Sequence, residues 1–279
     1  MSIEAEVVSV MPMQMERGAP ADNVLRTTDA EVEKFLDSKR RALGLQAECP
    51  CMGKSDLDAK LQKLSKVTNC SLGLGIHGSD LPVDMCFPLT NPDLAVLGEC
   101  IRRGGFKSLQ AMYLQNQHGY KGTISNLGNP CHMNSFDDAG IEALAEGARV
   151  KPLAALKRLR LGRNRFGDAG VAALAKTMAA GGFPSLEELE LNATKVTDAG
   201  LEALTTALKT RGDGALSNLK TIYLFANDKT TPPAQEALVA VAKEAGVAAR
   251  FDTSGNQVGI GLLPGVYGGG VNHAGVSAF

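Results

Sequence analysis

The chain has 279 residues, of which 44% are hydrophobic and 21% are charged, and its formal net charge is -1. A chain of this length can bury a substantial core, and it fits one folded domain with appended segments. Its near-neutral charge, with Lys and Arg scattered through the chain, gives no reason to expect nucleic acid as a partner.

No window of eighteen consecutive apolar residues occurs, so we expect no transmembrane helix. Glu4 and Glu6 stand where a signal peptide needs positive charge. The six cysteines are widely spread, which is typical of free thiols in a reducing compartment rather than of a disulfide framework. These features predict a cytoplasmic protein.

The N-terminal part is expected to hold an extension with one helix, followed by degenerate cap repeats. Residues 1–55 form an extension with one predicted helix over 29–43, for which Thr28 is a suitable cap. The apolar spacing over 56–67 predicts a second, amphipathic helix, and the segment from Leu89 predicts a third.

A repeat of thirty residues is the strongest signal in the chain. FDDAGIEALA, FGDAGVAALA and VTDAGLEALT begin at Phe136, Phe166 and Val196. Their apolar residues recur at helical spacing, which predicts three amphipathic helices. Asp138, Asp168 and Asp198 stand at the start of these helices. Each is predicted to be an N-cap, where free N–H groups favour a carboxylate.

A second repeated element lies between these helices. LQAMYLQNQ, LKRLRLGRN, LEELELNAT and LKTIYLFAN begin at Leu109, Leu156, Leu186 and Leu219, and they fit L-x-x-L-x-L-x-x-N. The final place is held by Asn164 and Asn227, and less well by Gln117 and Thr194. Leucines that alternate along these segments predict short strands with one buried face.

Neither element can bury its apolar face alone, so the units must stack in register. The pattern N-x-[FV]-x-D-x-G-[VL]-x-x-L-A, as in Asn164 to Ala175, resembles leucine-rich repeats of the ribonuclease-inhibitor-like type. The resemblance implies an α/β leucine-rich-repeat solenoid over residues 56–252, a horseshoe with a parallel concave sheet and convex helices. The last repeat is predicted to hold a helix over 235–245 and a strand over 247–251.

On such a sheet, the residues that flank the inward leucines face the concave side. The basic pair Arg158 and Arg160 should stand beside the acidic pair Glu188 and Glu190. The two pairs either neutralise each other or help to bind a partner. Exposed aromatic residues there are typical binding anchors. The predicted protein-binding residues are Tyr113, Gln115, Arg158, Arg160, Glu188, Glu190, Tyr223 and Phe225.

Two further segments depart from the repeat. Residues 118–134 are an insertion of about seventeen residues between strand and helix, either a tolerated surface loop or a contact for a partner. The tail, residues 253–279, has no charged side chain and is rich in Gly and Val. Because disordered tails are usually charged, this composition favours attachment to the chain's own surface or to a larger assembly.

Enzyme motifs are weak. G-x-G-x-x-G at Gly73 lacks a following helix, and the Gly53–Ser55 segment has Glu48 where a phosphate loop needs glycine. Cys49, Cys51, Cys131 and His132 lack the spacing of a zinc site. We therefore predict no catalytic residue, no cofactor and no metal.

The sequence favours a non-catalytic protein–protein interaction or scaffold module with a protein partner, as a subunit of a larger assembly. A purely structural subunit held by its tails is a variant of this hypothesis. The alternative is a GTPase-activating regulator that resembles the Ran GTPase-activating proteins, which share this repeat type.

Overall fold

The computed structural model describes residues 27–39, 57–71, 89–116, 134–210 and 215–251. Within them the chain forms seven helices and six strands. The helices are α1 (Asp29–Ser38), α2 (Leu57–Leu64), α3 (Asn91–Arg102), α4 (Asp138–Val150), α5 (Asp168–Ala179), α6 (Asp198–Thr210) and α7 (Pro232–Glu244). The strands are β1 (Asn69–Ser71), β2 (Ala111–Tyr113), β3 (Arg158–Arg160), β4 (Glu188–Glu190), β5 (Thr221–Tyr223) and β6 (Ala248–Arg250).

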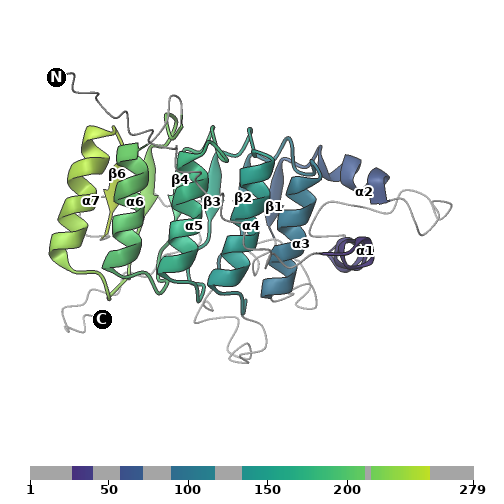
Figure 1. Ribbon diagram of the computed structural model, residues 1–279, viewed down its shortest axis with the longest axis horizontal. Coiled ribbons are helices and arrows are strands. Elements are labelled where there is room, and N and C mark those ends of the chain that lie inside the picture. The colour runs from purple at the N-terminus through teal and green to yellow at the C-terminus, as the bar shows by residue number, and fades with distance from the viewer. Residues whose placement is uncertain (1–26, 40–56, 72–88, 117–133, 211–214, 252–279) are drawn as a thin grey trace, which may run out of the picture.

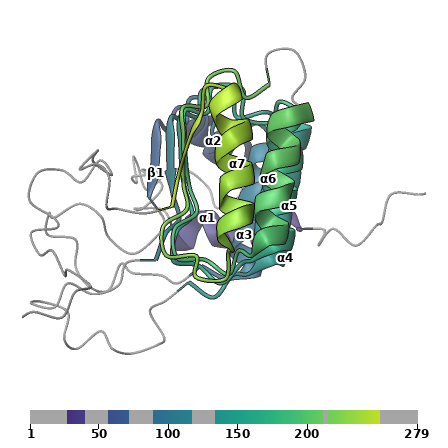
Figure 2. The same ribbon diagram turned by 90° about the vertical axis from the view of Figure 1, so that its left-hand side faces the viewer.

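The strands form one parallel sheet in chain order, β1 to β6. Its central column is buried: Leu159, Leu189 and Ile222 lie in register and are at most 1% exposed. Helices α3 to α7 stand side by side in one layer and the sheet forms the other (Figure 1, Figure 2). The predicted stacking of strand and helix units is therefore confirmed.

Buried asparagines hold the turn after each strand. The Asn164 side chain donates to the carbonyls of Leu161 and Leu114 at 2.8 and 2.9 Å, so it ties its own repeat to the preceding one. Asn227 likewise donates to the carbonyls of Leu224 in its own repeat and Leu191 in the preceding one. In that preceding repeat Thr194 takes the place of the asparagine, and its hydroxyl donates to the Leu191 carbonyl. These bonds satisfy carbonyls that would otherwise be buried without a donor.

The predicted insertion is displaced by one residue. Asn134, which is 1% exposed, donates to the carbonyl of Leu114 at 2.9 Å, as the other repeat asparagines do to their own strands. It therefore belongs to the repeat and occupies the place predicted for Gln117. The inserted residues are 117–133, which lie outside the described residues.

The prediction that Asp138, Asp168 and Asp198 cap their own helices is wrong, because each is the first helical residue. Each carboxylate instead reaches the next repeat. Asp168 accepts from the Thr197 and Gly200 amides at 2.8 and 2.9 Å. A Cβ on Gly200 would lie 2.7 Å from this carboxylate. The aspartate of each D-A-G triplet therefore caps the start of the next repeat's helix, and the glycine of a triplet leaves room for the aspartate of the previous repeat.

The N-terminal end contains a strand, β1, that sequence reasoning missed. Strand β1 pairs with β2, and Cys70 is fully buried at the place where later strands carry leucine, methionine or isoleucine. Thr28 caps α1 in a reciprocal capping box with Glu31, as predicted. Helix α1 then packs on α3, and Arg103 binds Asp29 at 2.7 Å.

Several boundaries differ from the predicted ones. Helix α7 begins at Pro232 rather than at 235, because proline fits the first turn of a helix, where its missing N–H is not needed. Strand β6 is shorter than the predicted 247–251. None of the described helices is long and apolar enough to span a membrane.

Candidate functional site

The sheet face turned away from the helices carries six of the eight predicted binding residues, while Gln115 and Phe225 lie two residues beyond the ends of β2 and β5. We call this face the outer sheet face. Strands β2 to β6 present one side chain each in a row across it, at the register positions Tyr113, Arg160, Glu190, Tyr223 and Arg250. Parallel in-register strands place such residues side by side on one face.

The basic and acidic pairs meet as the spacing predicts. The Arg158 Nε lies 3.6 Å from a Glu188 carboxylate oxygen, and the Arg160 Nε lies 3.5 Å from one of Glu190. Arg160 also lies 3.8 Å from Glu188. At these distances the groups are ion pairs rather than hydrogen bonds, and each exposed pair contributes only about 0.2–1 kcal/mol.

Glu190 is the most perturbed carboxylate of this face. Burial raises its pKa, although Arg160 and the Asn192 side chain favour the charged form. The carboxylate leans over Gly162, where a Cβ would approach it to 2.9 Å. The surroundings of this carboxylate thus only partly compensate its charged form.

Glu190→Gln is expected to stabilise the protein near neutral pH. Because the folded-state pKa is raised, Glu190 contributes stability that is present below the ordinary glutamate pKa and lost as pH rises through the folded value. The difference in unfolding free energy between variant and parent should therefore shrink toward pH 4. Urea titrations at a series of pH values measure it. Glu188→Gln, on the more exposed side chain of the same strand, is the control.

The aromatic residues are less exposed than predicted. Tyr223 is only 9% exposed, so the expectation of an exposed aromatic anchor is wrong at this position. It lies between Glu190 and Arg250 in the register and packs on Phe225, with ring centroids 5.8 Å apart. Tyr113 is half-buried beneath the Arg160 guanidinium, at 5.3 Å. Phe225, also half-buried, is the better candidate anchor.

One comparison with known proteins agrees with this architecture. A family model described as Leucine Rich repeat matches residues 155–175 and 184–204. The chain contains leucine-rich repeats. Among solved structures it is similar to leiomodin-1 actin-binding site 2, with 13% identity and a TM-score of 0.44, over 68% of this chain and 90% of that one. No curated protein matches its sequence.

Among the described residues, two buried polar side-chain atoms lack hydrogen-bond partners. They are the Oε1 of Gln115, two residues after β2, and the Nε of Arg250 in β6. Gln115 was among the predicted residues, whereas Arg250 was missed because its repeat departs from the L-x-x-L-x-L pattern.

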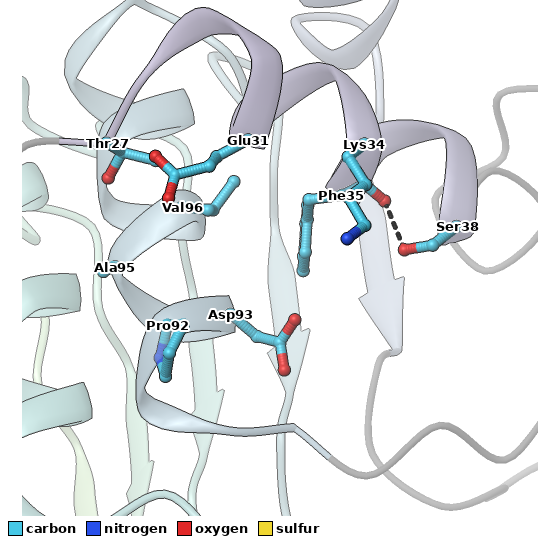
Figure 3. A pocket seen from close by; sticks show the side chains of 9 residues that line it. All are labelled: Thr27, Glu31, Lys34, Phe35, Ser38, Pro92, Asp93, Ala95 and Val96. Carbon is cyan, nitrogen blue, oxygen red and sulfur yellow. Dashed lines mark hydrogen bonds between the residues drawn. The ribbon is translucent and has the colours of Figure 1, made fainter.

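A pocket of about 370 Å³ lies elsewhere, between α1 and α3 (Figure 3). The Glu31 and Asp93 carboxylates both line it, and both accept hydrogen bonds from the cap threonine of their own helix. We assign it no ligand, because these groups serve the helix caps. Its lining residues are Thr27, Glu31, Lys34, Phe35, Ser38, Pro92, Asp93, Ala95 and Val96.

The enzyme-like motifs at Gly73, at 53–55 and around Cys49, Cys51, Cys131 and His132 lie outside the described residues. Within the described part of the chain, no three metal-ligating side chains gather. Leucine-rich repeats are typically protein-interaction modules.

Proposed function

We propose that the chain is a non-catalytic protein-interaction module that binds its partner on the outer sheet face. The observation that carries the proposal is Glu190, a largely buried carboxylate with a raised pKa at the centre of an array built from successive repeats. A fold gains no stability from such a group, whereas a binding surface uses it for specificity. Arg158, half exposed, lies on the neighbouring strand β3 beside Glu188, and Phe225 lies two residues beyond the end of the other neighbouring strand, β5.

The charges favour a partner segment that carries both signs. Strand β3 and the residue before it present Lys157, Arg158 and Arg160, while the equivalent positions of β4 present Glu187, Glu188 and Glu190. An acidic group that docks over β3 and a basic group over β4 would strengthen both rows. Like charges in the reversed orientation would be repelled, which fixes the orientation of the partner.

The test begins with capture of partners on the immobilised full chain from an extract of its own cells. Binding of the captured protein is then measured for Arg158→Ala/Phe225→Ala. We expect at least a tenfold weaker affinity, equivalent to about 1.4 kcal/mol, because a half-buried aromatic anchor and a flanking charge are both lost.

The matched control is Lys176→Ala/Glu202→Ala, which removes two exposed charges from the helix layer. It should change the affinity less than twofold. Equal losses in the two variants, or none in the sheet variant, would contradict the assignment of the outer sheet face.

The same complex tests the wider proposals. We propose that the chain acts as a scaffold subunit of a larger assembly, which the stoichiometry of the captured complex measures. Stimulated GTP hydrolysis by a captured GTPase would instead support the Ran-type alternative.

We place the chain in the cytoplasm, which cell fractionation tests. Burial raises the pKa of the free Cys70 and Cys100 thiols to about 12, a state compatible with a reducing compartment.

A further inference from the structure

The helix layer ends at α7 with one side uncovered. The eighth helical residue of each repeat faces the next helix: the Ala145 carbonyl of α4 accepts from Thr177 of α5 at 3.3 Å, and Ala145 is 2% exposed. Its counterpart in α7, Val239, is 41% exposed. Within the described part of the chain no helix follows α7, so the position that elsewhere meets a neighbouring helix carries an exposed valine here.

The sheet ends at β6, which pairs with β5 alone among the described strands. The Ala248 amide donates to Lys220 and the Arg250 carbonyl accepts from Leu224, both at 2.8 Å, so these groups face β5. Alternation along the strand turns the amide and the carbonyl of Ala249 outward. Two antiparallel strands form their closely spaced pair of hydrogen bonds through one such residue on each strand.

The exposed stripe of α7 is complementary to itself. Glu236, Val239, Ala240 and Lys243 are all exposed and follow the spacing of one helical face. The acidic and the basic end of this stripe stand equally far from its apolar centre. A second α7 that runs in the opposite direction therefore brings Glu236 of each copy near Lys243 of the other. A parallel neighbour would set like charges side by side instead.

The ends of the molecule disfavour stacking of copies in the same direction. Asp198 accepts from the Thr231 amide at 2.7 Å and so caps α7, but the equivalent first residue of α7 is Pro232, which has no side-chain acceptor for a following helix. At the opposite end, α1 packs on α3 and on α2 (Figure 1). A head-to-tail array would have to displace these helices, whereas a two-fold pair uses the same end of both copies and is closed.

We propose that two copies of this chain pair at the α7–β6 end about a two-fold axis perpendicular to the sheet. Such an axis keeps strand beside strand and helix beside helix, so β6 and α7 each pair antiparallel with their equivalents. Ala249 of each copy exchanges two hydrogen bonds with Ala249 of the other. Val239 is the eighth of 13 residues in α7 and Ala249 the middle residue of β6, so each stands near mid-height of its element, where one axis passes close to both.

This pairing joins the two sheets side by side. Arg250 of each copy lies opposite Ala248 of the other, whose small side chain leaves room for the guanidinium. Because the axis is perpendicular to the sheet, both outer sheet faces point in the same direction. The pair thus presents two such faces at once, which raises the apparent affinity of each for a partner with two binding segments. The pairing itself does not depend on what the outer sheet face binds.

Light scattering on the full chain over a range of concentrations tests the proposal. We expect the mass to rise toward twice that of one chain. Glu236→Lys opposes Lys243 with lysine in both contacts of the pair and should weaken dimerisation by about tenfold or more. Glu236→Lys/Lys243→Glu restores opposite charges and should recover most of the parent's affinity. The control is Glu202→Lys, at the equivalent exposed position of α6, which should leave the affinity unchanged.

Ala249→Pro tests the sheet edge. Proline removes the outward N–H but none of the groups that bond to β5, so dimerisation should be lost while urea denaturation still shows a folded chain. In the parent, hydrogen exchange of the Ala249 amide should slow as concentration rises. A chain that stays monomeric at every concentration would overturn the proposal, as would a dimer that survives both Glu236→Lys and Ala249→Pro. Failure of the charge-swapped double variant to regain affinity would overturn the antiparallel contact of α7.

Discussion

Leu189→Ala is expected to lower the free energy of unfolding by roughly 2–5 kcal/mol. Leu189 is fully buried in β4, at the middle of the sheet, with Leu159 and Ile222 beside it in the register. Its removal leaves a cavity that both neighbouring repeats line, and these repeats cannot close it without breaking their own strand pairing. Urea denaturation followed by circular dichroism measures the loss.

Val150→Ala provides the comparison, since Val150 is 50% exposed at the end of α4. It should change the unfolding free energy by no more than about 0.5 kcal/mol. A shift of similar size in both variants would contradict the assignment of the leucine column to the core. A large loss confined to Leu189 would agree with the dependence of each repeat on its neighbours.

Local periodicity explains why so much of the fold was predictable. Leucines that alternate around Leu159 and Leu189 indicate strands, and the spacing after each D-A-G triplet indicates helices. Once helix and strand segments alternate along the chain at intervals of about thirty residues, parallel stacking is the arrangement that buries both faces. The first strand escaped prediction because Cys70 replaces the expected leucine and residues 72–88 separate it from its helix.

Contacts between repeats were less accessible from the sequence. The position of Asp168 at a helix start is visible in the chain, but its bonds to Thr197 and Gly200 depend on where the next repeat lies. The burial of Tyr223 likewise depends on neighbours from other repeats. Asn134 did leave a signal, since N-S-F-D-D matches N-R-F-G-D from Asn164, but the inserted residues before it obscured the alignment.

The candidate site also has a structural role that its charges explain. Three near-identical repeats could stack in a wrong order, because their helices and leucines are almost interchangeable. The basic residues of β3 lie against the acidic residues of β4, with Arg158 and Arg160 facing Glu188 and Glu190. A second copy of either strand in that place would oppose like charges, so the rows select one neighbour even though each pair is weak.

Asn164→Ala is expected to cost roughly 2–3 kcal/mol of unfolding free energy, because buried groups that lose a hydrogen bond bear most of the penalty. The Asn164 side chain is 4% exposed and donates to Leu114 and Leu161, and its oxygen accepts from Asn134 at 3.3 Å. The truncation removes these bonds together and leaves the Leu161 carbonyl without its side-chain donor. Urea denaturation measures the change.

Asn218→Ala is the matched control. Asn218 also donates its amide to a backbone carbonyl, that of Pro184 at 2.9 Å, but from an exposed position where water replaces the lost bond. It should cost less than about 0.5 kcal/mol. If both substitutions lower the unfolding free energy by the same small amount, the hydrogen bonds of the buried asparagines do not hold the repeats together, and the buried leucines alone must do so. A loss at Asn164 that exceeds the control by 1 kcal/mol or more would show that polar bonds between repeats, as well as apolar burial, set the stability of this solenoid.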